Sequence, residues 1–265
     1  MSSPNSAPLS GAAVSSVPVT PPARPRSPRT WYFLGTTLFG VGVYAVEMIA
    51  QLATFIALFI WNGLLPIAEP EQLRALMREG GWLGLSAIVA CPFVLGALWV
   101  PIRIARQNFS DYLGLRWPDR REVFSGLAML AALIVAWILV RLAAGQPIPA
   151  FTTETYRSAT TDGPMVAYVI GFCVAAPIAE ELLVRGFLFR GWSQSFLGPA
   201  GAIVLTSVAW AALHTQYNLF YMAHIFTLGI LLGYLRHRSG STWLTVILHA
   251  AHNVVSIAQV ALIIG

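Results

Sequence analysis

The 265-residue chain contains no lysine, only two cysteines, and few charged residues of any kind. Charged residues make up 10% of the sequence, whereas soluble domains usually hold ~25%. This scarcity of charge excludes an ordinary soluble domain. The cysteines, Cys91 and Cys173, both fall in apolar runs and have neither disulfide nor metal-ligand spacing, so they predict no disulfide and no metal site.

Hydrophobic residues make up 57% of the chain and are gathered in long runs. Several runs reach about 20 residues, the length that crosses a ~30 Å hydrocarbon core. The sequence therefore predicts an all-α polytopic membrane protein, in which residues 30–265 form one bundle of about seven helices with a cavity inside the membrane. The expected spans are Trp31–Trp61, Trp82–Ile102, Val123–Ala144, Met165–Phe189, Gly198–His214, Tyr217–Leu235 and Thr242–Ile264.

Residues 1–29 are rich in proline, serine and alanine and are expected to form a disordered tail. No apolar segment precedes a cleavage site within them, so they are not read as a signal peptide. Because every basic residue is arginine, the sequence favours a GC-rich, bacterial genome and hence the inner (plasma) membrane.

The distribution of arginine predicts the orientation, because cytoplasmic segments carry an excess of basic residues. One side of the bundle would collect Arg24, Arg26, Arg29, Arg103, Arg106, Arg116, Arg120, Arg121, Arg190, Arg236 and Arg238, and the other only Arg74, Arg78, Arg141 and Arg157. The N-terminus is therefore expected in the cytoplasm and the C-terminus outside. Since these arginines lie beside spans, the net charge of +5 indicates contact with lipid headgroups and not with nucleic acid.

Two adjacent carboxylates, Glu180 and Glu181, interrupt the apolar run Met165–Phe189. An ionisable group in a span costs roughly 2.5–3.5 kcal/mol or more and usually marks a functional site. Glu181 and Arg185 are four residues apart, so on a helix they share a face and can pair. Glu180 points elsewhere, which leaves it available. The alternative is a helix end at the membrane surface, with these charges simply solvated.

Histidines interrupt two later apolar runs. His214 ends the run Ala200–Leu213, and His249 and Asn253, four residues apart, share a face in the last run. The segments Glu180-Glu181-x-x-x-Arg185-Gly186, Trp210-x-x-x-His214 and His249-x-x-x-Asn253 resemble the three motifs of the CPBP intramembrane proteases. This CaaX-protease and bacteriocin-processing family, also called Abi, includes the type II CaaX prenyl endopeptidases.

The resemblance covers a core of about residues 113–255. Trp210 stands where the family usually has phenylalanine, and we expect this difference to alter packing and not chemistry. The resemblance implies an intramembrane endopeptidase that acts on a membrane-associated peptide or protein tail. A prenylated tail, or a bacteriocin or pheromone precursor, is the substrate that it suggests.

The chemistry needs a base, a water molecule and an oxyanion stabiliser. Glu180 is the expected base that removes a proton from water. His214, His249 and the Asn253 amide are the expected donors to the oxyanion, a role worth roughly 3–4 kcal/mol per donor. Arg185 would hold Glu181 and its helix in place. This division of labour is also what the resemblance implies.

Three alternatives stay open at this stage. Glu180, His214 and His249 could bind zinc with water in the fourth position, although the His-Glu-x-x-His signature is absent and catalysis without a metal cofactor is favoured. A transporter would use Glu47, Glu180 and His249 as a proton relay. A bacteriocin-immunity or scaffold protein would keep the residues without turnover. The sequence contains neither the Gly-x-Ser-Gly nor the Gly-x-Gly-Asp site of other intramembrane proteases.

Residue counting predicts how the motifs meet. Glu180 and His214 each lie about 17 residues from the turn near Phe196, so they should sit at similar depth, whereas His249 should be shallower. Pro177 should kink the fourth span, because its ring removes a helical hydrogen bond. The Gly229-x-x-x-Gly233 pair predicts a close helix contact.

Overall fold

A computed structural model describes residues 30–64, 69–161 and 164–264, and the expected tail at residues 1–29 lies outside these ranges. In the described ranges the chain forms helices and no strand, which confirms the all-α prediction. The elements are α1 (Tyr32–Trp61), α2 (Pro70–Leu76), α3 (Gly80–Ile104), α4 (Phe109–Leu113), α5 (Arg120–Ala143), α6 (Ala150–Thr161), α7 (Met165–Ile170), η1 (Gly171–Ala175), α8 (Ala176–Glu181), η2 (Leu182–Leu188), α9 (Phe189–Ser193), α10 (Gly198–Ala212), α11 (Leu219–Ser239) and α12 (Thr242–Ile264).

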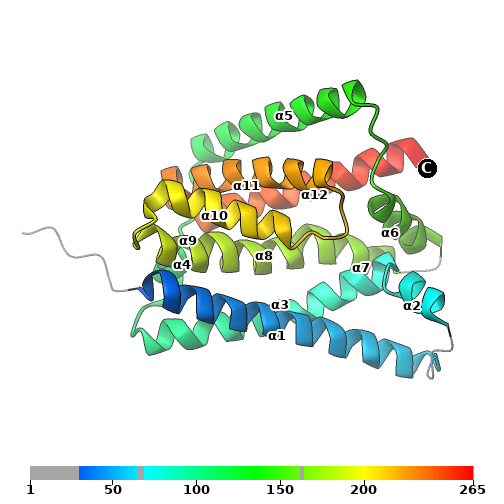
Figure 1. Cartoon of the computed structure of the whole chain (residues 1–265), viewed down its shortest axis with the longest axis horizontal. Helices are drawn as coiled ribbons and strands as arrows, with labels where there is room; N and C mark the ends of the chain where they lie inside the picture. The colour runs from blue at the N-terminus through cyan, green and yellow to red at the C-terminus, as the bar shows by residue number, and fades with distance from the viewer. Residues whose placement is uncertain (1–29, 65–68, 162–163, 265) are drawn as a thin grey trace, which may run out of the picture.

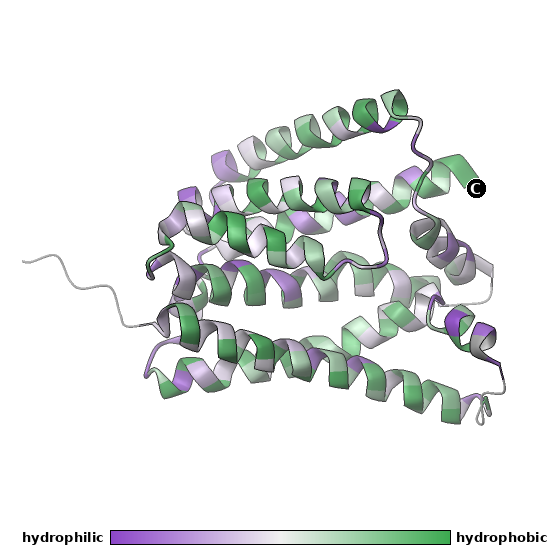
Figure 2. Ribbon diagram, in the orientation of Figure 1, coloured by the Kyte–Doolittle hydropathy of each residue, from purple (hydrophilic) through white to green (hydrophobic). Residues whose placement is uncertain are grey.

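The long helices lie side by side in one bundle, with α1 beginning and α12 ending at opposite ends (Figure 1). Apolar residues run along these helices, and polar residues gather at their ends and in α6 (Figure 2). Many apolar side chains face outward; Leu34, Leu38 and Ile49 of α1 are 68%, 65% and 66% exposed. Such a surface needs lipid around it, so the chain is an integral membrane protein.

The expected fifth span is the exception to the seven-helix prediction. Among the residues that the structure describes, six helices have the length and apolar composition to cross a membrane, counting α7 to α9 as one. Helix α10 has only 15 residues, about 22 Å at ~1.5 Å per residue. It therefore ends inside the bundle, and the loop that follows it lies between the two ends of the molecule (Figure 1).

The fourth span carries the paired glutamates on a short α-helix between two π-helical turns. In η1 the amide of Ala176 bonds to the carbonyl of Gly171, five residues back, and in η2 Phe189 bonds to Val184 in the same way. Beside Pro177, where a kink was expected, the helix has a widened turn. Because such a turn inserts a residue, it changes which residues before and after it share a face of the helix. Phe172 and Ala176 line the cavity together with Glu180, whereas Cys173 is buried and does not line it.

Two glycines bring α3 and the fourth span into backbone contact. A Cβ atom on Gly171 would lie 2.3 Å from the Cα of Gly84, so neither position accepts a side chain. This contact packs the widened turn of η1 directly against the backbone of α3. The core continues towards the other end of the bundle with Leu98, Leu113 and Phe187, all fully buried.

Helix α12 begins below the surface of the bundle. Its first residue, Thr242, is fully buried, and its amide donates to the carbonyl of Gly114 at 2.8 Å. Two residues earlier, Gly240 has φ of 70° and caps the end of α11. Helix α12 therefore starts already packed against the short segment α4.

Candidate active site

Glu181 is the centre of a fully buried polar cluster. Its side chain is 0% exposed, and its Oε1 accepts from Arg185 Nη1 at 2.8 Å and from His249 Nδ1 at 3.0 Å. The predicted ion pair between Glu181 and Arg185 is confirmed. The carboxylate also joins the fourth span to α12, a contact that residue spacing did not reveal.

Arg185 extends the cluster to α11 and α10. Its Nη2 donates to the carbonyl of Gly229 at 3.3 Å, and its guanidinium lies 4.5 Å from the centre of the Trp210 ring. A Cβ on Gly229 would lie 2.9 Å from the Ser207 side chain. The close contact predicted for Gly229-x-x-x-Gly233 is thus confirmed, and it lets α11 present a carbonyl to the buried arginine.

Trp210 is the residue whose role the sequence did not predict. Its indole Nε1 donates to Glu180 Oε2 at 2.6 Å. Its backbone carbonyl lies 2.8 Å from His214 Nδ1, and its ring meets the rings of His214 and His249 edge-on, each at 5.2 Å. The expectation of altered packing alone was incomplete, because phenylalanine has no donor for the Glu180 carboxylate.

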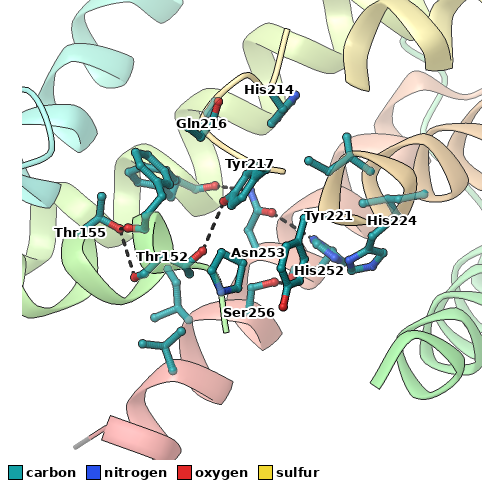
Figure 3. Close-up of a pocket in the computed structure, with 18 of the residues that line it drawn as sticks. Thr152, Thr155, His214, Gln216, Tyr217, Tyr221, His224, His252, Asn253 and Ser256 are labelled. Atoms are coloured by element: carbon teal, nitrogen blue, oxygen red, sulfur yellow. Dashed lines mark hydrogen bonds between the residues drawn. The ribbon is translucent and has the colours of Figure 1, made fainter. Parts of the chain in front are cut away.

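His214 lies just beyond the last residue of α10. Because a carbonyl only accepts, the contact with Trp210 places a proton on Nδ1 of His214 and leaves Nε2 for the cavity. Tyr217 stacks on the imidazole with ring centres 6.3 Å apart, and its hydroxyl shares a hydrogen bond of 3.4 Å with Thr152 (Figure 3). Tyr217 and Thr152 were not singled out from the sequence, because tyrosine and threonine have no distinctive spacing there.

His249 lies deeper than residue counting predicted. Its contact with Glu181 sets it at the level of the paired glutamates. The count assumed that α12 begins at the membrane surface, whereas Thr242 and Thr245 are already fully buried. The similar depth expected for Glu180 and His214 agrees with the structure, since Trp210 contacts both.

Asn253 ties the third motif to the fourth span. Its amide nitrogen donates to the carbonyl of Phe172 at 2.8 Å, and its oxygen accepts from His252 Nδ1 at 3.3 Å (Figure 3). The ring of His224 lies 5.3 Å from that of His252. Asn253 is therefore held through its nitrogen by the fourth span and through its oxygen by His252.

A cavity of about 370 Å³ brings the candidate residues together. Its lining includes four of the six predicted site residues, Glu180, His214, His249 and Asn253. The other two, Glu181 and Arg185, are buried behind it and do not line it. The pair therefore separates as predicted, into one available and one structural carboxylate.

The possible zinc ligands of the cavity, Glu180, His214 and His249, do not converge on one point in this structure. Within residues 30–64, 69–161 and 164–264, no three histidine, cysteine, aspartate or glutamate side chains lie close enough together to hold one ion. Glu180, His214 and His249 share the cavity, but Glu180 is bonded to Trp210 and His249 to Glu181. The residues as placed therefore do not fit the zinc alternative.

Residues 162–255 match the model of the Rce1-like type II CAAX prenyl endopeptidases. This match includes all three motifs and confirms their resemblance to the type II CaaX prenyl endopeptidases over these residues, although the expected core began earlier, at about residue 113. The chain is also 26% identical over 163 residues to an "Uncharacterized 24.3 kDa protein" of Escherichia coli, over 60% of this chain and 70% of that protein. No solved structure matches the chain significantly. The family match supports a membrane-embedded protease.

Removing either partner of the buried pair should destabilise the fold. Glu181→Ala or Arg185→Ala leaves an uncompensated charge, which typically costs about 3–5 kcal/mol. Thermal melting of the purified protein in detergent measures the loss. The control is the double variant Glu181→Leu, Arg185→Met, which removes both charges and should melt closer to the parent. Parent-like melting of both single variants would show that the pair does not stabilise the fold.

Proposed function

We propose that the chain hydrolyses a peptide bond of a membrane-associated peptide or protein tail, with Glu180 as the general base. The observation that supports this most is the placement of Glu180 in a cavity with His214, His249 and Asn253, while Glu181 is buried behind it. A general base must be accessible and oriented. The hydrogen bond from Trp210 orients the Glu180 carboxylate.

In the reaction, a water molecule in the cavity gives a proton to Glu180 as its oxygen bonds to the scissile carbonyl carbon. The carbonyl π electrons move to oxygen, which becomes an oxyanion. When the intermediate collapses, the C–N bond breaks and Glu180 returns the proton to the leaving amine. One water is consumed, and a carboxylic acid and an amine are released.

The oxyanion would be held by donors that line the same cavity as Glu180. His214 Nδ1 already donates to a carbonyl and His249 Nδ1 faces a carboxylate, so each ring needs a second proton, on Nε2, to donate into the cavity. The Asn253 amide uses one hydrogen on Phe172 and keeps another. Each such donor is worth roughly 3–4 kcal/mol in the transition state.

The competing functions receive less support. Glu47 is not among the cavity-lining residues of the described chain, so only two groups of the transporter hypothesis, Glu180 and His249, border the cavity. Glu47 accepts at 3.3 Å from Gln51, which does line the cavity. A non-catalytic immunity or scaffold protein has no need for an oriented, accessible carboxylate. Catalysis without a metal cofactor is proposed over the zinc mechanism because no three ligands converge among the described residues.

Glu180→Gln tests the base directly. The change is nearly isosteric but cannot take up a proton, so the turnover number should fall about 100-fold or more. Cleavage of an apolar peptide library by the purified protein, read by mass spectrometry, measures it. Glu47→Gln is the matched control and should keep parent-like turnover. Undiminished cleavage by Glu180→Gln would return the paired carboxylates to a structural role.

Trp210→Phe tests the orientation of the base. Phenylalanine keeps the aromatic ring beside Arg185 but loses the indole donor, and a hydrogen bond to a charged group contributes about 1.5–3 kcal/mol. We expect kcat to fall about tenfold or more while KM and the melting temperature stay close to the parent. Steady-state kinetics separates the two constants. An unchanged kcat would show that the Trp210 bond does not position Glu180.

A further inference from the structure

The cavity extends from Glu180 towards only one end of the bundle. Its walls come from the last turns of α5 and the second half of α12, represented by Trp137, Arg141 and Ser256. Helix α6 and the first turns of α3 complete them, represented by Thr152 and Ser86. All these parts lie at the end of the bundle where α5 and α12 stop (Figure 1).

The opposite direction is closed by packed side chains. On the side of Glu180 away from the cavity, the side chains of Glu181 and Arg185 are 0% exposed and Val184 is 5% exposed. Beyond them, Tyr112 and Leu113 of α4 are buried against the fourth span, where Tyr112 stacks on Phe187 and Leu113 lies against Gly186. A peptide approaching from this end would have to displace the core.

The two ends differ sharply in charge. Among the described residues, the closed end holds eight arginines, Arg103, Arg106, Arg116, Arg120, Arg121, Arg190, Arg236 and Arg238, against three acidic residues, Asp111, Asp119 and Glu122. The open end holds four arginines, Arg74, Arg78, Arg141 and Arg157, against four glutamates, Glu69, Glu71, Glu79 and Glu154. Since arginine accumulates on the cytoplasmic side, the closed end is the cytoplasmic one.

At the open end, the helices that line the cavity are held together by hydrogen bonds and an ion pair. Helix α6 is held to the start of α3 by the amide of Gly80, which donates to Ser158 Oγ at 2.9 Å, and by the ion pair of Arg78 with Glu154 at 2.8 Å. Apart from Glu180 at the base and Arg141 near the end of α5, the cavity lining has no acidic or arginine side chain among the described residues. Aromatic, aliphatic and hydroxyl groups dominate it, which suits an apolar chain with free backbone amides.

We propose that the cavity opens on the extracytoplasmic side of the membrane and that its substrate is an apolar peptide segment presented there; this proposal rests on the function proposed above. A cytoplasmic tail, prenylated or not, would reach Glu180 only through the closed core. The substrate class is therefore a secreted peptide or the outward-facing tail of a membrane protein.

Thiol labelling tests the access side without assuming any activity. Ser256→Cys places a thiol in the cavity lining, and Ser110→Cys is the matched control, exposed at the arginine-rich end. In sealed spheroplasts, a membrane-impermeant charged maleimide should label Ser256→Cys at least tenfold faster than the parent, which holds only Cys91 and Cys173. Ser110→Cys should react only after permeabilisation. Labelling of Ser256→Cys only after permeabilisation, or under neither condition, would overturn the proposal.

Cleavage in the same spheroplasts separates the two proposals. An apolar peptide library added outside should be cut by the parent at least tenfold faster than by Glu180→Gln, before any permeabilisation. Cleavage that depends on Glu180 but appears only after permeabilisation would overturn the extracytoplasmic access and leave the protease function intact. If neither preparation cleaves while Ser256→Cys is labelled from outside, the protease function fails and the access side stands.

Discussion

The structure depends on one buried carboxylate. Glu181 accepts from Arg185 on its own helix and from His249 on α12, and Arg185 reaches α11 and the Trp210 ring. Taking such charges out of water is costly, and only mutual pairing with good geometry repays the cost. The pairing therefore fixes how the fourth span, α10, α11 and α12 sit relative to one another. Glu180, the next residue along the chain, is positioned by this arrangement without taking part in it.

Two irregularities make a working cavity inside an apolar bundle. Widened turns lie on either side of the short helix that carries Glu180 and Glu181. Because neighbouring helical residues diverge by about 100°, one carboxylate faces the cavity and the other the core. The short α10 ends inside the bundle and places His214 there, where a full span would have carried it to the surface. Backbone that departs from the regular helix at membrane depth is tolerated where it is buried or lines a cavity.

Much of this was predictable from the sequence, and the rest depended on long-range packing. Apolar runs gave the helices, and i to i+4 spacing gave the pair of Glu181 and Arg185. Spacing along one helix says nothing about a partner on another, so the contact of His249 with Glu181 was missed. Counting residues from a turn placed His249 too shallow, since it assumed that α12 starts at the surface. The donor role of Trp210 was missed because the residue was compared with the family's phenylalanine by size and aromatic character alone.

The central claim, that Glu180 activates water without a metal ion, is tested by one measurement on one purified sample. Metal content and peptide cleavage are determined together, before and after treatment with a strong chelator. The account predicts undiminished cleavage in a sample that holds far less than one metal ion per chain. Zinc bound at one ion per chain, with cleavage lost on chelation and restored on adding zinc back, would contradict it.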